Sequence, residues 1–192
     1  MSPSGDYVVV NVAGRCDILD EQMKLLRTLD IDGGSQADMT YDMAGNEVIV
    51  SSYYEGGRGD ITITTRLSDN AKQQQLPGPG KPAGIYQASS YHISRRNIDR
   101  PGYCYISNFA FDSALGAYMF REVFALKLDS ICTVERFSPD FKAPLPLADL
   151  DYERRAHAVP NRDGSLVLFS SDWGDRGSNA IVHDYVVGVR VP

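Results

Sequence analysis

The sequence predicts an all-β protein, a portion of a β-propeller with about four blades of antiparallel four-stranded sheets, and three observations support this. A glycine in a polar turn, followed by an apolar run, occurs four times in the 192-residue chain. These runs are rich in Val, Ile, Tyr, Phe and Thr, the residues that strands prefer. A single four-stranded unit cannot bury both of its faces, whereas sheets stacked around an axis can.

The four glycine turns mark the repeating units. They lie roughly 40 to 60 residues apart, a spacing typical of propellers and other repeat arrays. Gly, Asn and Asp dominate these turns, where a positive φ or a side-chain bond to the backbone is needed. The turns and the strands that follow them are SPSGDYVVVNVAG at Gly5, YDMAGNEVIVSSYY at Gly45, DRPGYCYISNF at Gly102 and NRDGSLVLFSSDW at Gly164.

The other strands of each unit follow from the same comparison. A short innermost strand precedes the glycine in three units, at 35–42, 90–97 and 154–161. A third strand follows the glycine strand in all four units, at 16–20, 60–68, 122–129 and 180–187. A fourth, outermost strand is expected in three units, at 23–30, 72–76 and 133–138. The second strands are nearly continuous in apolar residues, as expected for strands covered on both faces.

The expected blades are incomplete at both ends of the chain. Their approximate bounds are 1–33, 34–80, 88–140 and 152–192. The first unit opens at its second strand and the last unit closes after its third. We expect the C-terminal portion of a longer propeller, with N-terminal blades of the same chain missing, and a complete four-bladed ring stays open as an alternative. A β-sandwich is the structural alternative to any propeller.

Composition and charge narrow the function classes. The chain is 43% hydrophobic and carries a net charge of −6, which argues against nucleic acid as a partner. It has no apolar run long enough to span a membrane, and its N-terminus, MSPSGDYVVVNVAG, lacks the pattern of a signal peptide. Cys16, Cys104 and Cys132 are widely spaced, which indicates neither a zinc site nor a disulfide framework.

Two segments carry a resemblance to known proteins. SPSGDYVVV and RDGSLVLFSSDWGD resemble the repeats of TolB-like and WD-repeat-like bacterial propellers. The pattern H-x-x-x-x-x-D-G-x-x-hydrophobic-x-F-x-S-D is similar to that of oligogalacturonate lyases. This resemblance implies a periplasmic or extracellular protein that acts on polysaccharide with a catalytic His and Arg and a manganese ion. The family has a Gln and two close His before the last such turn, where this chain has His157 alone, so the metal ligands and cofactor stay unknown.

Charged and polar residues gather in the expected innermost strands, which line the axial channel of a propeller. Uronate β-elimination needs a cation for the sugar carboxylate and a base for the α-proton. We therefore expect His92 and His157 as candidate catalytic residues, because His titrates near neutral pH. The candidate substrate-binding residues are Arg95, Arg155, Gln36, Asp38 and Trp173.

Other interpretations of these residues stay open. Polar residues in a propeller channel often bind only water and each other, and Trp173 could fill a gap between blades rather than stack on a sugar. Arg95 lies seven residues before Gly102, and His157 lies seven residues before Gly164. This equal spacing predicts that Arg95 neighbours His157 and that His92 neighbours Arg155. We therefore expect either a lyase-like action on an acidic polysaccharide or non-catalytic binding of a glycan or protein partner.

Overall fold

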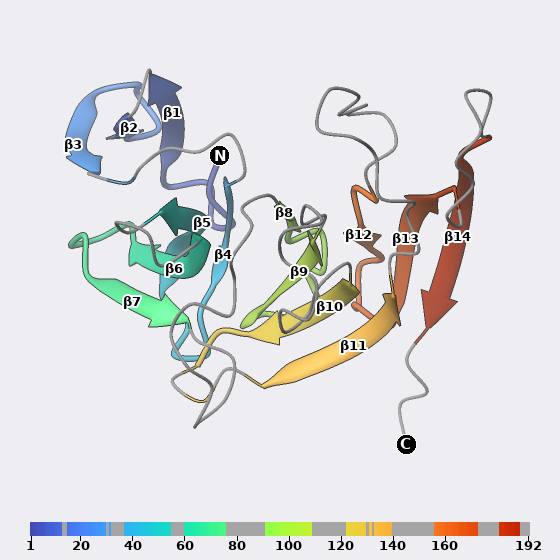
Figure 1. Ribbon diagram of the computed structural model, residues 1–192. Helices are drawn as coiled ribbons and strands as arrows, with labels where there is room; N and C mark the ends of the chain where they lie inside the picture. The colour runs from blue at the N-terminus through green and yellow to red at the C-terminus, as the bar shows by residue number, and fades with distance from the viewer. Residues whose placement is uncertain are drawn as a thin grey trace.

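The chain is all-β in the parts that the structure describes. The structure is a computed structural model, and it describes residues 1–12, 15–29, 31, 37–54, 60–75, 91–108, 122–129, 131, 133–139, 156–172 and 181–188. These residues form four separate antiparallel sheets of three or four strands each (Figure 1). No helix in these ranges is long and apolar enough to cross a lipid bilayer.

Each sheet is a meander in chain order, with hydrogen bonds between successive strands. The first sheet contains β1 (Val8–Val12), β2 (Arg15–Leu19) and β3 (Leu25–Leu29). The second sheet contains β4 (Ala37–Tyr41), β5 (Glu47–Tyr54), β6 (Asp60–Arg66) and β7 (Lys72–Gln75). The third sheet contains β8 (Tyr91–Ser94), β9 (Tyr103–Asn108), β10 (Glu122–Lys127) and β11 (Val134–Pro139). The fourth sheet contains β12 (Val159–Pro160), β13 (Leu166–Ser171) and β14 (His183–Gly188). Four sheets in this order exclude a sandwich of two facing sheets.

The four repeated glycines occupy equivalent places, each just ahead of the second strand of its unit. All four have a positive φ, between 70° and 91°, which glycine adopts without steric cost. In three of the turns the glycine N–H donates to the carbonyl three residues earlier, at 3.1 Å. The exception is Gly102, whose N–H donates instead to the carbonyl of Tyr41 in the second sheet, at 3.0 Å. The repeat predicted from these glycines is therefore present in the structure.

Within the described ranges the core consists of three apolar clusters, one between each pair of successive sheets. The cluster between the first two sheets contains Cys16, Ile18, Leu29, Ile31, Ile49 and Leu67. The cluster between the second and third contains Val48, Val50, Ile93, Cys104, Ile106, Phe124, Leu126 and Leu128. The cluster between the third and fourth contains Tyr105, Val123, Ala125, Ala156, Ala158, Val167 and Phe169.

Alternation along single strands explains how one sheet joins two clusters. Successive side chains of a strand point to opposite faces. On β5, Ile49 packs toward the first sheet while Val48 and Val50 pack toward the third. On β10, Phe124 and Ala125 divide in the same way between the second and fourth sheets. The two middle sheets are thus covered on both faces, which is why their second strands are almost uniformly apolar.

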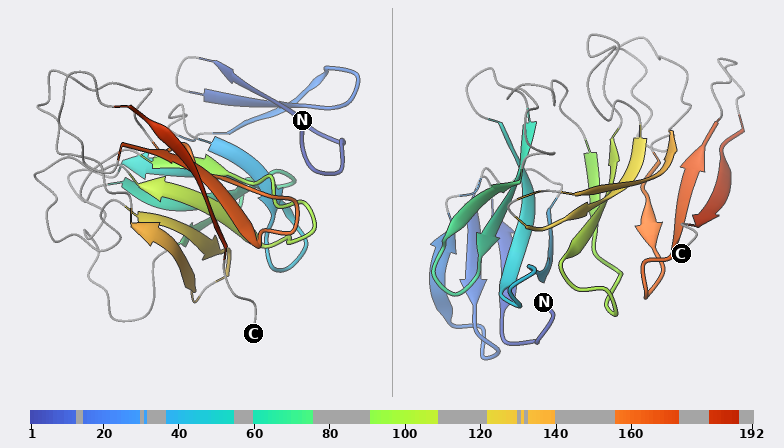
Figure 2. Two further views of the ribbon diagram at one scale, coloured as in Figure 1. Left: turned by 90° about the vertical axis from the view of Figure 1, so that its right-hand side faces the viewer. Right: turned by 90° about the horizontal axis from the view of Figure 1, so that it is seen from below.

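The sheets stand in a row in chain order. The first, second, third and fourth sheets follow one another from blue to red, and the first and last lie at opposite ends of the row (Figures 1 and 2). Contacts between β4 and β8, and between β11 and β14, join neighbouring sheets. This arrangement brings the edge strands of neighbouring sheets side by side and positions the polar residues described next.

Candidate functional site

Four of the predicted site residues lie on or close to the first strands of three sheets. β4, β8 and β12 are each the edge strand of their sheet, and each comes first in its unit. We call the row formed by these three strands, with the residues directly next to them, the inner edge. Among the described residues, the inner edge brings together Asp38, His92, Arg95 and His157, all of them partly exposed.

The two predicted catalytic histidines are in contact. The ring centroids of His92 and His157 are 5.1 Å apart, and the rings meet edge to face at 72°. His92 belongs to β8 and His157 lies just before β12, so the contact spans the third and fourth sheets. Two imidazoles from different sheets therefore share one small, partly exposed space.

Two of the predicted substrate-binding residues, Asp38 and Arg95, form an ion pair between the second and third sheets. The Arg95 Nε donates to one Asp38 carboxylate oxygen at 3.3 Å, and the Arg95 backbone N–H donates to the other at 3.1 Å. The Arg95 side chain is 23% exposed and that of Asp38 is 32% exposed. Asp38 thus orients the guanidinium group along its Nε side, and within the described ranges no partner is found for the terminal nitrogens.

The backbone around His157 is held in an unusual conformation. His157 has a φ of 42°, in the left-handed region that residues with a Cβ rarely adopt. Such a residue costs of the order of 1 kcal/mol or more and persists only where its surroundings determine it. Here Ala158 N–H donates to the Ser107 hydroxyl at 3.2 Å, and Ser170 N–H donates to the Ala156 carbonyl at 2.9 Å. Both neighbours of His157 are thereby anchored, and its ring is held against His92.

The surroundings of His92 favour its neutral form. Burial lowers the pKa of His92 below the usual value, and the neighbouring His157 lowers it further. Asp38 acts in the opposite direction and raises the pKa of His92, but it does not overcome the other two. Because the usual pKa of histidine is about 6.5, His92 is a neutral base at pH 7.

This electrostatic coupling can be measured by NMR titration of the imidazole groups. In His157→Gln the pKa of His92 should rise, because a positive neighbour is removed, but it should stay below 6.5, about the usual value, because burial is the larger cause. In Asp38→Asn the pKa of His92 should fall, since a negative neighbour is lost. His183, the third histidine of the chain, lies on β14 and provides the internal control. An unchanged pKa of His92 in both variants would show that the three groups are not close.

The pairing differs from the predicted one because one connection is longer. Between β4 and β5 the connection covers residues 42–46, and between β12 and β13 it covers 161–165, whereas between β8 and β9 it covers 95–102. The third unit therefore has three residues more ahead of its second strand. Counting back from the glycine misses this insertion, so His92 rather than Arg95 contacts His157. Arg95 instead pairs with Asp38, and both residues stand seven positions before the glycine of their own unit.

Several residues named from the sequence lie elsewhere. Gln36, Arg155 and Trp173 fall outside the described residues, so the predicted pair of His92 with Arg155 stays a prediction. Asp38 is at the inner edge as expected, but its immediate partner is Arg95. His183 is exposed on an edge strand, with its ring 6.4 Å from that of Tyr185.

The metal site that the lyase resemblance implies does not fit the described residues. Across those ranges, no three His, Cys, Asp or Glu side chains are close enough together to hold a metal ion. His92 and His157 would supply two nitrogen ligands, and a zinc or manganese site needs more than that. The chemistry of the inner edge is therefore derived from its own side chains.

Sequence reasoning missed a second network that spans the third and fourth sheets. The buried Tyr105 hydroxyl donates to the Gly164 carbonyl at 2.7 Å and accepts from Arg100 at 3.0 Å. Arg100 also binds Glu135 at 2.6 Å and stacks on the Tyr103 ring at 3.8 Å. Burial raises the pKa of Tyr105 above its usual range. This network links the β8–β9 connection, which holds Arg100, to the turn at Gly164. The sequence signal that could have predicted it is Tyr105 in an apolar strand, because a buried Tyr needs a hydrogen-bond partner for its hydroxyl.

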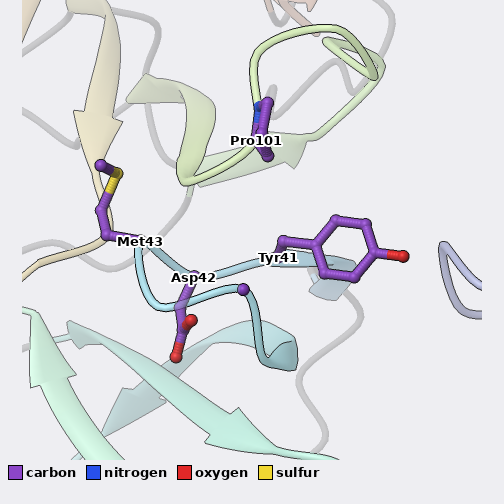
Figure 3. A pocket seen from close by; sticks show the side chains of 5 residues that line it. Tyr41, Asp42, Met43 and Pro101 are labelled. Atoms are coloured by element: carbon purple, nitrogen blue, oxygen red, sulfur yellow. The ribbon is translucent and has the colours of Figure 1, made fainter.

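A pocket at the glycine turns is a weaker candidate for a site. It has a volume of about 380 Å³, lies between the β4–β5 turn and the β8–β9 connection, and is lined by Tyr41, Asp42, Met43, Gly45 and Pro101 (Figure 3). Its carboxylate is occupied within the turn, because Asp42 accepts hydrogen bonds from Ala44 N–H and from Asn46. The inner edge is the stronger candidate, because it holds two histidines, an arginine and a carboxylate that are all partly exposed.

No model of a known protein family matches this sequence, and no curated protein is significantly similar to it.

Proposed function

We propose that the four sheets are successive blades of a β-propeller and that the inner edge lies at its axis. The strand order supports this, since β4, β8 and β12, which come first in the three later sheets, are each an edge strand. The three clusters support it too, because each sheet packs on the next with the same pair of opposite faces. Ligands of propellers bind where the innermost strands converge, and here His92 lies on one of those strands while Arg95 and His157 lie close to their ends.

We propose that the inner edge binds an acidic sugar, such as a uronate-containing oligosaccharide. The contact between His92 and His157 carries this proposal, because it brings two predicted site residues from separate sheets together. Arg95 supplies the charge, and its terminal nitrogens offer a carboxylate the paired donors that guanidinium groups provide. Asp38 holds this guanidinium in place through its Nε side, so less conformational entropy is lost on binding.

Lyase-like chemistry would follow if the α-proton of a bound uronate faced His92. The neutral imidazole would take that proton, a C=C double bond would form beside the carboxylate, and the glycosidic C–O bond at the β-carbon would break. The leaving oxygen would receive a proton from the second imidazole or from water. The lowered pKa of His92 suits the role of base, since the group is unprotonated at neutral pH.

Non-catalytic binding is the second candidate, and one observation favours it. Arg95 is already paired with Asp38, so part of its charge is neutralised before any ligand arrives. A glycan or a protein could then bind the inner edge without reacting. Both functions predict binding at the same residues, and they differ only in turnover.

Calorimetry with oligogalacturonate and with a neutral oligosaccharide of equal length tests the binding proposal. Arg95→Ala should weaken binding of the acidic ligand by roughly tenfold to a hundredfold, because a hydrogen bond to a charged group contributes about 1.5–3 kcal/mol. Arg96→Ala is the matched control, since Arg96 is the next residue and is exposed. The double variant Asp38→Asn/Arg95→Ala separates loss of the cation from repulsion by an unpaired Asp38. Equal affinity for the two sugars, or equal losses in Arg95→Ala and Arg96→Ala, would contradict the proposal.

Turnover is read from the ultraviolet absorbance of the conjugated double bond that elimination creates. If the protein is lyase-like, His92→Ala should keep its affinity for the ligand and lose turnover. Binding without any new absorbance in the unaltered protein would leave non-catalytic binding as the function.

A further inference from the structure

A second pocket lies between the first and second sheets, at the end where the glycine turns are found. It has a volume of about 320 Å³ and is enclosed by three turns, at residues 1–7, 42–46 and 67–71. Every residue of these turns belongs to the described ranges. The walls include Asp6 and Tyr7 from the first sheet's turn, and Tyr41, Glu47 and Ser68 from the second sheet. We call this hollow the junction pocket.

The alternation of side chains along the strands brings two tyrosines to the junction pocket. On β5, Glu47 shares a face with Ile49, which packs toward the first sheet. Tyr41 pairs with Glu47 across β4 and β5 and lies on the same face, and its ring points away from Met43 (Figure 3). From the first sheet, Tyr7 packs against the same apolar cluster. The pocket is therefore the polar end of this junction, where apolar residues give way to phenol rings and carboxylates.

The two carboxylates of the junction pocket have no cation beside them in the part of the chain that the structure describes. Asp6 is exposed, and no described side chain bonds to its carboxylate. Glu47 accepts a single hydrogen bond, from the Ser4 N–H at 2.7 Å. Arg27 is the one described cation that bonds to the pocket wall, and it donates to the Ser68 backbone carbonyl. Two phenol rings beside uncompensated negative charge form an environment that attracts a cation.

The junction between the third and fourth sheets shows which cation such a set of groups holds. At the same end of the sheets, the guanidinium group of Arg100 stacks on the Tyr103 ring, with 3.8 Å between its Cζ and the ring centroid. It also donates to the Tyr105 hydroxyl at 3.0 Å and to Glu135 Oε1 at 2.6 Å. Two tyrosines and a glutamate thus bind a guanidinium group within this chain. The junction pocket offers two tyrosines and two carboxylates.

We propose that the junction pocket binds a guanidinium group, carried by a small ligand or by an arginine side chain of a protein partner. A tyrosine ring contacts the planar face of the group, as Tyr103 does with Arg100. Asp6 and Glu47 accept hydrogen bonds from its N–H donors, in the geometry that guanidinium and carboxylate groups share. The site goes beyond the proposed sugar binding, because it takes a cation and contains no residue of the inner edge.

NMR titration and calorimetry with arginine blocked at both ends test the proposal, with citrulline blocked in the same way as the reference. Citrulline has nearly the same shape but carries no charge. The arginine probe should bind with a dissociation constant of about 1 mM or lower. The citrulline probe should bind roughly tenfold more weakly or worse, because its hydrogen bonds to the carboxylates lack the charge of the donor. The ring signals of Tyr7 and Tyr41 should shift, and those of His92 and His157 should stay in place.

Two matched variants locate the site. Asp6→Asn should weaken binding of the arginine probe by roughly tenfold, because it removes one carboxylate and keeps the shape of the side chain. Glu21→Gln is the control, since it removes the same charge from the exposed β2–β3 turn of the same sheet and should leave binding unchanged. Equal affinity for arginine and citrulline, or equal losses in the two variants, would overturn the proposal. Ring signals of Tyr7 and Tyr41 that do not move with about 10 mM arginine probe would overturn it as well.

An acetylated and amidated tripeptide with arginine at its centre distinguishes the two sources of the group. Tighter binding of the tripeptide than of blocked arginine assigns the pocket to a protein partner, because the neighbouring backbone then adds contacts. Equal affinity assigns it to a small ligand. A tripeptide that binds while blocked arginine does not, and that binds equally well with citrulline at its centre, would contradict recognition of the guanidinium group.

Discussion

Replacing Gly164 by alanine is expected to lower the free energy of unfolding by about 3 kcal/mol. The residue has a φ of 70°, which costs a residue with a Cβ roughly 1–2 kcal/mol. The added Cβ would also overlap the Tyr105 hydroxyl and lie 3.0 Å from the Arg100 Cδ. Tyr105 would have to move, which adds an overpacking cost and weakens its hydrogen bond to the Gly164 carbonyl, together about 1–3 kcal/mol.

The matched control is Gly45→Ala, measured in the same urea denaturation. Gly45 has nearly the same conformation, with a φ of 81°, but no atom lies within 4 Å of its added Cβ. It should lose only the conformational part, about 1–2 kcal/mol. The difference between the two variants measures the network of Tyr105 and Arg100. Equal losses at both positions would show that Tyr105 does not lie against the Gly164 turn.

Replacing Phe124 by alanine should be more damaging still, with a loss of about 3–5 kcal/mol. Phe124 is 2% exposed and packs in the cluster between the second and third sheets. The smaller side chain loses apolar burial and leaves a cavity that the two sheets cannot fully close. The measurement is again the free energy of unfolding from urea denaturation.

Ile98→Ala serves as the control for Phe124→Ala, because Ile98 is a large apolar residue that is 62% exposed. A surface substitution of this kind should change the free energy of unfolding by about 0.5 kcal/mol or less. A loss at Phe124 as small as that at Ile98 would mean that the second and third sheets do not pack face to face, and the order of the sheets would have to be revised.

The strands could be predicted because their signals are local. A glycine such as Gly45 is needed wherever φ is positive, and the apolar run that follows it reports burial on both faces. The repeat of these signals gave the second strand of every unit, and the structure confirms four sheets built around them. Closure into a ring depends on how sheets pack over long distances, so the propeller itself stays a proposal.

The site could be predicted only in part, because it depends on contacts between sheets. The residue type and the innermost strands singled out His92 and His157, and the structure places their rings in contact. Their partners were missed for a geometric reason, since three additional residues in the 95–102 connection change which residues are level. The pair of Asp38 with Arg95 also crosses from one sheet to the next, and it was not predicted although both residues stand seven positions before the glycine of their unit.

The most direct test of the account is an NMR titration of the labelled protein with oligogalacturonate, in which the three imidazole signals are followed. His92 and His157 lie together at the inner edge, whereas His183 lies on the edge strand β14 of the fourth sheet. The account predicts that the His92 and His157 signals shift together and saturate at one ligand concentration, while the His183 signal stays in place. Unchanged His92 and His157 signals at saturating ligand, or a shift of His183 alone, would contradict the claim that the inner edge binds an acidic sugar.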